Sequence, residues 1–259
     1  MRHDRSIKLQ LVLIAFSVLV SVSPISGQTQ NDWQLDRWPV DLETEFALSA
    51  LPAHLRSEAT VYILDPAKSY YIVRQGTNGF SCFVSRTEWE WADFAKDHAA
   101  PISYDAEGSK TILHVFLDVA AMRASGKYSA MQVRDTIVQR VKNGVYKAPS
   151  KPGISYMLAP MMRTYPGTKE MVSMYARHYM FYAPYLTNED IGGRPGSEHP
   201  AVLSPSENVL GVGKSPFNYI VLTAGKTETA RIIEENKNLL KRLAEYKPYL
   251  RVKSDEQHH

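Results

Sequence analysis

The 259-residue sequence predicts an α+β fold, with a mostly antiparallel sheet of about six strands, an αα-hairpin and a long C-terminal helix packed on it. Two observations lead to this prediction. Short β-rich segments and helical segments come in blocks and do not alternate regularly, which disfavours a doubly wound parallel sheet. An apolar content of 44% is also enough for one substantial core. We therefore expect a single α+β domain over residues 46–250.

The first block of strands lies between residues 60 and 85. A β-rich segment over 60–64 ends at the turn dipeptide Asp65-Pro66, and a second segment covers 70–74. The loop that follows contains Asn78-Gly79 and leads into a third β-rich segment over 80–85. An Asn-Gly pair between two such segments is typical of a hairpin. The pattern predicts three strands in meander order.

Apolar residues at helical spacing predict the αα-hairpin, with one helix over 109–125 and another over 129–143. Ser129 and Gln132 have the spacing of a capping box, which indicates that the second helix begins there. The other predicted elements are helices over 47–55, 87–97 and 227–246 and strands over 154–158, 178–182 and 219–223.

The first 27 residues predict a cleaved signal peptide. A basic start is followed by an apolar run over 9–22, which is shorter than the roughly 20 apolar residues of a membrane-spanning helix. Ser26 and Gly27 are small and offer a cleavage point. The alternative is an uncleaved N-terminal anchor. We expect a secreted or periplasmic protein with no membrane contact after cleavage, a loosely ordered arm over 28–45 and a disordered tail over 251–259.

The net charge of the chain narrows the classes of partner that the protein can have. Cleavage after residue 27 removes three basic residues and one acidic residue, which lowers the formal charge from +3 to about +1. A surface so close to neutral gives no electrostatic reason to expect nucleic acid as a partner.

Cys82 is the single cysteine, so no intramolecular disulfide can form. Stability must therefore come from the core.

A hydrolase-type enzyme is one hypothesis for function. Its catalytic residues would be Cys82 or a carboxylate, with His178 or His199 as the base, because a thiolate nucleophile needs a base within reach. In a strand, however, Cys82 shares an apolar face with Phe80 and Val84. That position favours a buried and unreactive thiol.

Metal binding is a second hypothesis. Six of the nine methionines lie between residues 157 and 180, and Met171, Met174 and His178 are the candidate ligands for copper, since thioethers favour Cu(I). Non-covalent haem ligation by histidine or methionine is a further alternative. The loop over 188–199, with Asp190, could instead hold Ca²⁺ through its oxygens. Methionines are also common core fillers, and such a loop can be plain solvated surface.

A small-ligand binding or sensing module without catalysis is the leading hypothesis. The aromatic segment over 178–185 includes Tyr182 and predicts either a doubly buried strand or one wall of a pocket. Asp105 and Glu107 lie at the start of a predicted helix, where backbone N–H groups can receive an anion. Acidic residues at that position also complement the helix dipole without a ligand. With Asp190 of the glycine-containing loop, these are the candidate ligand-binding residues.

Three segments of the chain carry a resemblance. They are GFSCFVSR over 79–86, HYMFYAP over 178–184 and NEDIGG over 188–193. With these segments the chain resembles a set of exported bacterial proteins to which no function is attached. The resemblance implies export, and it implies no reaction, ligand or catalytic residue.

Overall fold

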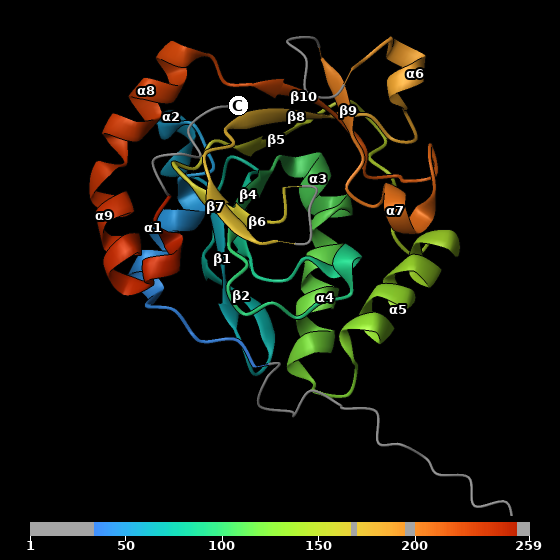
Figure 1. Cartoon of the computed structure of the whole chain (residues 1–259), viewed down its shortest axis with the longest axis horizontal. Helices are drawn as coiled ribbons and strands as arrows, with labels where there is room; N and C mark the ends of the chain where they lie inside the picture. The colour runs from blue at the N-terminus through green and yellow to red at the C-terminus, as the bar shows by residue number, and fades with distance from the viewer. Residues whose placement is uncertain (1–33, 167–169, 195–199, 253–259) are drawn as a thin grey trace, which may run out of the picture.

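The protein, described by a computed structural model over residues 34–166, 170–194 and 200–252, has an α+β fold on a mostly antiparallel sheet. This sheet has eight strands, not six, in the order β2-β1-β3-β4-β5-β8-β10-β9 (Figure 1). Its strands are β1 (Thr60–Asp65), β2 (Ser69–Arg74), β3 (Ser81–Ser85), β4 (Ala100–Tyr104), β5 (Ile154–Met157), β8 (His178–Tyr182), β9 (Ala201–Leu203) and β10 (Tyr219–Thr223). A separate hairpin pairs β6 (Met162–Thr164) with β7 (Val172–Met174).

The predicted meander of the first three strands is wrong. Strand β3 does not pair with β2. It crosses to the other side of β1 and runs parallel to it. The crossing passes close over the start of β1, where a Cβ on Gly76 would lie 2.2 Å from the carbonyl oxygen of Glu58. Only glycine fits there, and Asn78 then donates its side-chain amide to Leu55 O at 2.8 Å. Asn78-Gly79 therefore belongs to a crossover and not to a hairpin.

Strand β4 is absent from the sequence prediction because it contains Pro101, which has no N–H for a sheet ladder. The strand lies in the centre of the sheet, between β3 and β5. However, β5 pairs only with Ser103 and Tyr104, so the β5 side of Pro101 has no neighbouring strand that requires an N–H. On its other side, Pro101 lies opposite Val84. The proline is thus accommodated at a position that behaves locally as an edge.

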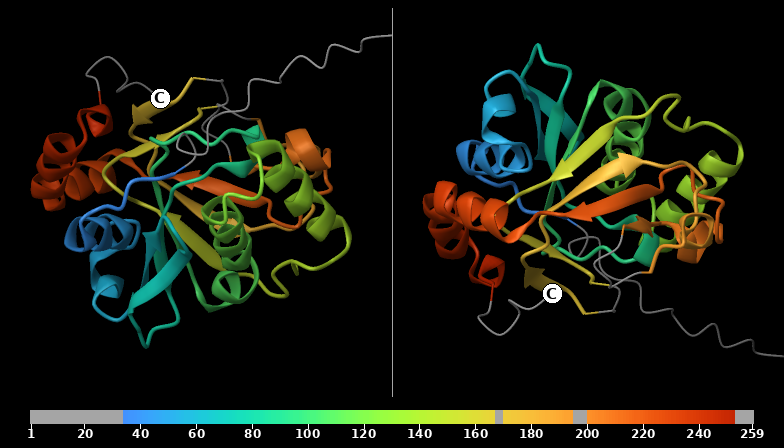
Figure 2. Two further views of the ribbon diagram at one scale, coloured as in Figure 1. Left: turned by 90° about the horizontal axis from the view of Figure 1, so that it is seen from below. Right: turned by 90° about the horizontal axis from the view of Figure 1, so that it is seen from above.

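Helices cover both faces of the sheet (Figure 2). One face packs against α4 and α5 through a core that includes Phe83, Tyr104 and Met180. The other face packs against α1 and α9 through Val61, Cys82 and Leu243. The helices are α1 (Val40–Leu48), α2 (Ala53–Arg56), α3 (Ala106–Thr111), α4 (Leu113–Ala124), α5 (Ala130–Lys142), α6 (Asn188–Ile191), α7 (Glu207–Leu210), α8 (Lys226–Glu235) and α9 (Lys237–Tyr246), with 3-10 turns η2 (Trp89–Trp91) and η3 (Pro248–Leu250).

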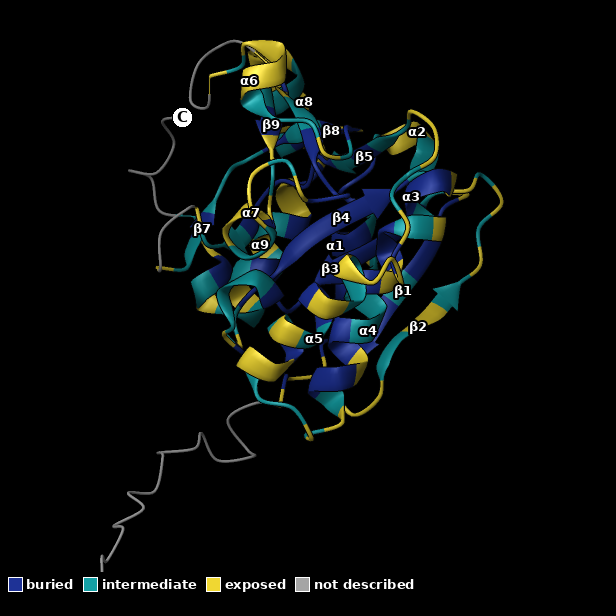
Figure 3. Cartoon of the chain, turned by 90° about the vertical axis from the view of Figure 1, so that its right-hand side faces the viewer, coloured by how far each residue is buried: buried dark blue, intermediate teal, exposed yellow. Residues whose placement is uncertain are grey.

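Burial is greatest at the middle of the sheet. All five residues of β3 and all five of β4 are buried, as Figure 3 shows, because both faces of these strands are covered. Toward the other edge the cover is thinner, and Phe181 of β8 and Leu222 of β10 are 41% and 50% exposed. The strand in the aromatic segment over 178–185 is therefore buried on one face only. Its buried residues are Met180 and Tyr182.

The helical predictions hold where the local signal is strong. Helix α5 begins with the predicted capping box, in which Ser129 and Gln132 bond reciprocally. The single helix expected over 109–125 is two helices, α3 and α4, and its start is capped by Asp105. In place of a helix over 87–97 there is only the 3-10 turn η2.

The long C-terminal helix is not confirmed, because the chain is divided into α8 and α9 at Asn236. Asn236 is buried, and its side-chain amide donates to the carbonyl oxygen of Ile232 at 2.7 Å. A side chain that bonds the preceding turn in this way competes with the helical backbone.

At the N-terminal end of the described chain, order begins earlier than predicted. Helix α1 starts at Val40, inside the segment expected to be a loose arm, and Trp38 is 2% exposed. Trp38 precedes α1 and stacks on Phe46 within it. No helix among the described residues is long and apolar enough to cross a membrane. The predicted signal peptide lies outside the described residues.

Candidate functional site

The proposed cysteine–histidine pair does not form. Cys82 is fully buried in the core that faces α1, and burial raises the pKa of its thiol far above the ordinary value. His178 lies on the opposite face of the sheet, since it pairs with Met157, which belongs to the core that faces α4. Three strand spacings also separate β3 from β8, which amounts to about 14 Å. His199 lies outside the described residues.

The candidate anion site at Asp105 is occupied by the carboxylate of Asp105 itself. Its Oδ1 accepts the N–H groups of Glu107 and Gly108 at 3.0 and 2.9 Å, and its Oδ2 accepts Ile154 N–H at 2.9 Å. Tyr182 donates its hydroxyl to the same Oδ1 at 2.9 Å. The structure thus brings together Asp105 and Tyr182, two of the candidate ligand-binding residues. Their contact joins α3 to β5 and β8 within the protein.

Glu107 and Asp190 are also engaged within the protein. Glu107 Oε1 accepts the backbone N–H and the hydroxyl of Ser150 at 2.6 and 2.8 Å, which lowers the pKa of this carboxyl. Asp190 accepts from the backbone N–H and hydroxyl of Thr187 and completes the capping box of α6. Among the described residues, no group of three or more His, Cys, Asp and Glu side chains is placed to hold a metal ion. Calcium binding by the Asp190 loop has no geometric support within these residues.

A groove of about 310 Å³ lies between the β6–β7 hairpin and η3. Its lining combines two arginines and a serine hydroxyl with apolar groups, and consists of Arg163, Met171, Val172, Ser173, Pro248, Tyr249 and Arg251. The volume is at the lower end of the range of small-molecule sites, about 300–1,000 Å³. Met171, a predicted copper ligand, lies here, whereas Met174 packs against the core beneath the hairpin. The groove is the candidate site.

Short-range pairing and a distant helix turn together build this groove. Arg163 and Ser173 are direct partners across the β6–β7 hairpin, and a bridge from Arg163 to Ala99 joins the hairpin to the main sheet. The opposite wall comes from η3, which is anchored because Leu250 is 1% exposed in the core that faces α1. The backbone carbonyl of Tyr249 accepts the hydroxyl proton of Ser173, which joins the two walls.

The guanidinium of Arg163 is held in a defined orientation. Its Nε and Nη2 donate to Asp97 Oδ2, with Nε at 2.7 Å, and Nη1 donates to Ser173 Oγ at 3.3 Å. Cζ of this guanidinium lies over the ring of Tyr249, 5.3 Å from the ring centroid. A guanidinium has five N–H donors, and three are engaged in these bonds. Two donors remain for a further acceptor in the groove.

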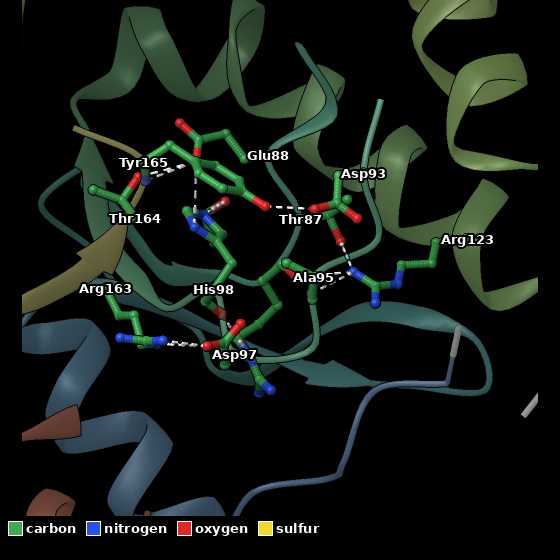
Figure 4. A network of polar contacts seen from close by, with 12 residues as sticks. Thr87, Glu88, Asp93, Ala95, Asp97, His98, Arg123, Arg163, Thr164 and Tyr165 are labelled. Carbon is green, nitrogen blue, oxygen red and sulfur yellow. Dashed lines mark hydrogen bonds and ion pairs between the residues drawn. The ribbon is translucent and has the colours of Figure 1, made fainter. Parts of the chain in front are cut away.

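Behind the groove lies a buried polar network, shown in Figure 4. The hydroxyl of Thr164 donates to Glu88 Oε2 at 3.0 Å, and Glu88 lies 3.6 Å from Nδ1 of His98. On its other side, Nε2 of His98 lies 3.3 Å from Ser85 Oγ. The network connects β3, η2 and β6, and with Asp97 it supports the hairpin that carries Arg163.

Ser85, His98 and Glu88 stand in the order of a nucleophile, a base and an orienting carboxylate. The chemistry of the site argues against that role. Burial, together with the nearby cations Arg86 and Arg123, lowers the pKa of His98 to about 3. Burial also raises the pKa of Glu88, which weakens the charge that would stabilise an imidazolium. Ser85 is 3% exposed, so a substrate has no access to it. We interpret this trio as a neutral structural support.

Sequence reasoning missed the groove because its parts are far apart in the chain. Asp97 and Arg163 are 66 residues apart, and Ser173 and Tyr249 are 76 residues apart. The hairpin strands have three residues each, too few for a clear alternation of polar and apolar positions. The one local signal for the groove is the Pro248-Tyr249 dipeptide after α9. The proline marks the end of the helix there, and the aromatic residue after it is a candidate wall of a site.

In comparisons with known proteins, no protein-family model, curated protein or solved structure matches the chain. The function must therefore be argued from the site.

Proposed function

We propose that the protein is a binding module whose groove holds a small amphipathic anion, with a carboxylate or similar oxyanion at one end and a short apolar chain at the other. The observation that carries this proposal is the oriented guanidinium of Arg163, which has two donors left beside Ser173. Arginine suits this task because its planar fork matches the geometry of a carboxylate.

The rest of the lining supports the same ligand class. Arg251 is exposed and adds a second positive charge at the groove. Met171, Val172 and Pro248 offer apolar contact for a short chain. Asp97 neutralises only one of the two arginines, so the groove keeps a net positive charge of about one by this count. A neutral or cationic ligand of the same shape gains nothing from that charge.

The experiment is a calorimetric titration with three probes that share one apolar tail: hexanoate, hexanol and hexylamine. We expect only hexanoate to bind, with a Kd of about 1 mM, as is reasonable for so small a ligand. Arg163→Gln weakens binding at least about tenfold, because a charge-assisted hydrogen bond contributes roughly 1.5–3 kcal/mol.

Two further variants keep the test interpretable. Arg251→Gln removes a charge from an exposed residue without touching Asp97, so weaker binding there cannot result from disturbance of the buried network. Arg134→Gln is the matched control, because Arg134 lies on α5 and pairs only with its neighbour Asp135 in the contacts described for it. Equal affinity for all three probes, or unchanged binding in both groove variants, contradicts the proposal.

Export belongs to the same proposal, since the apolar run over 9–22 and the small residues before Gln28 support a removable leader. Mass spectrometry of the protein from its natural host is expected to find a chain that starts at or near Gln28. A product that begins at Met1 contradicts this part of the proposal and leaves the ligand class standing.

A further inference from the structure

His178 opens β8 on the sheet face that packs against α4 and α5. In the β5–β8 ladder it is the direct partner of Met157, and Met180 follows two residues later on the same face. Directly opposed residues of an antiparallel pair have their Cβ atoms about 4.5–5.5 Å apart. The ring of His178 is thus adjacent to the Met157 side chain, and Met180 is next along the same face.

The tautomer of His178 follows from one hydrogen bond. Nδ1 lies 2.7 Å from the backbone carbonyl oxygen of Ala176. A carbonyl can only accept, so Nδ1 carries the proton and Nε2 carries a bare lone pair. An Nδ1–H bond to a backbone carbonyl is also the arrangement that orients metal-binding histidines.

Nε2 of His178 is buried, and no described residue donates to it. Burial lowers the pKa of the imidazole, so at neutral pH the ring stays uncharged and the lone pair stays available. A buried polar atom without a hydrogen bond is uncommon in proteins and calls for a physical explanation. Nδ1 of His98 is also such an atom, but it lies 3.6 Å from the carboxyl of Glu88.

The core on this face of the sheet is rich in thioether sulfur. Met157, Met162 and Met180 are buried in the core that faces α4, and Met174 packs against it. Met162 and Met174 are themselves direct partners across the β6–β7 hairpin. Thioethers and a neutral imidazole are the donors that Cu(I) prefers, whereas Mg²⁺ and Ca²⁺ require oxygen ligands.

We infer that Nε2 of His178 and the sulfur of Met157, with Met180 as a further thioether on the same sheet face, form a site for Cu(I). The site is separate from the groove and does not depend on the anion proposal. It also differs from the copper prediction made from sequence, because Met171 lines the groove and Met157 takes its place.

The test is an anaerobic titration of the full chain with Cu(I) against a chromogenic Cu(I) chelator. We expect one Cu(I) per chain in the wild type. His178→Gln and Met157→Leu each weaken binding at least about tenfold, since even the outer partners of metal ligands contribute that much. Met157→Leu conserves volume, and equal melting temperatures of this variant and the wild type confirm that its fold is intact.

Matched controls address copper held elsewhere. Met131→Leu changes a methionine that is 57% exposed, His114→Gln changes an exposed histidine, and H258Q with H259Q removes the two terminal histidines. None of these variants should alter the affinity. X-ray absorption of the loaded protein should show mixed nitrogen and sulfur ligation. Absence of stoichiometric binding, retention of affinity in both site variants, or ligation by nitrogen and oxygen alone overturns the inference.

Discussion

The ring of His98 and the ring of His178 lie inside the same protein, in environments of opposite kind. His98 has Ser85 Oγ at 3.3 Å on one side and Glu88 at 3.6 Å on the other, with Arg86 and Arg123 nearby. His178 has one backbone carbonyl at Nδ1 and methionines around its face of the sheet. Polar groups from several elements surround the first ring, and apolar groups surround the second.

The comparison shows how the same side chain can be structural in one place and available in another. Beside His98, Glu88 accepts the hydroxyl of Thr164 and Asp97 accepts the guanidinium of Arg163. These two contacts join the segment around η2 to the β6–β7 hairpin, which forms one wall of the groove. At His178 the lone pair of Nε2 supports nothing among the described residues.

Each ring has one buried nitrogen without a hydrogen bond among the described residues, Nδ1 in His98 and Nε2 in His178. Burial and a missing hydrogen bond therefore do not distinguish a structural histidine from a ligand. The neighbouring side chains differ, because Nδ1 of His98 lies 3.6 Å from the carboxyl of Glu88, whereas His178 shares its sheet face with methionines.

The largest expected effect concerns the acid stability that His98 controls. Its pKa is about 3 in the folded protein against 6.5 for an ordinary histidine, so below pH 6.5 the unfolded chain binds the extra proton. Stability should fall as the pH drops from 6.5 to 3, by on the order of 4 kcal/mol from this group. Urea unfolding across that range should show a shallower decline for His98→Gln than for the wild type. Parallel curves would mean that His98 is not held neutral.

Arg123 of α4 extends the polar network of Figure 4 to the segment between β3 and β4, and it should be the most sensitive position there. The acceptors of its guanidinium include Arg86 O, Thr87 Oγ1, Phe94 O and Ala95 O. Arg123→Met leaves these buried acceptors without their donor and should cost about 3 kcal/mol of unfolding free energy. Arg134→Met on the surface of α5 should change it by no more than about 0.5 kcal/mol. An equally small effect at Arg123 would refute the structural role of the network.

Ser85→Ala tests the neutral interpretation of the Ser85, His98 and Glu88 trio. We expect a loss of about 1 kcal/mol, the usual contribution of one neutral hydrogen bond. Binding of hexanoate in the groove should not change. If the wild type hydrolyses a chromogenic ester and Ser85→Ala abolishes that turnover, the trio is catalytic and our interpretation of it is wrong.

The methionines around His178 should be the most tolerant positions. Met157→Leu and Met162→Leu conserve volume and should each cost less than about 1.5 kcal/mol, which thermal unfolding of the metal-free protein can measure. A much larger loss in the absence of copper would show that these side chains are needed for close packing. The contrast with the polar network would then disappear.

Much of the fold can be predicted because its signals are local. The capping box at Ser129 joins residues three apart, and the strands β1, β2, β3, β5, β8 and β10 each stand out as β-rich segments. The sheet order cannot be obtained in the same way. It depends on the tight crossing at Gly76, and the local Asn78-Gly79 signal favours the wrong partner. Pro101 conceals β4 for a similar reason, since its tolerance depends on where β5 ends.

The candidate residues named from the sequence illustrate the same limit. Asp105 and Tyr182 do meet, yet their contact is a helix cap, and capping a helix or binding an anion requires the same residue types. Cys82 and His178 are chemically capable of reaction, but the alternation of side chains along β3 and β8 places them on opposite faces. Arg163 carries no local mark at all, since Asp97, Ser173 and Tyr249 reach it only through tertiary packing.

The groove is the centre of this account, and the Nη–H signal of Arg163 tests it most directly, because Nε–H is bonded to Asp97 and the two remaining donors lie on Nη1 and Nη2. This signal can be assigned in a nitrogen-15 NMR spectrum by its loss in Arg163→Lys. During a titration with hexanoate it should shift and saturate together with the backbone amide signals of Ser173 and Tyr249, while the amide of His98 stays in place. An Arg163 signal that does not move, or shifts confined to residues outside the groove, would contradict the proposed site.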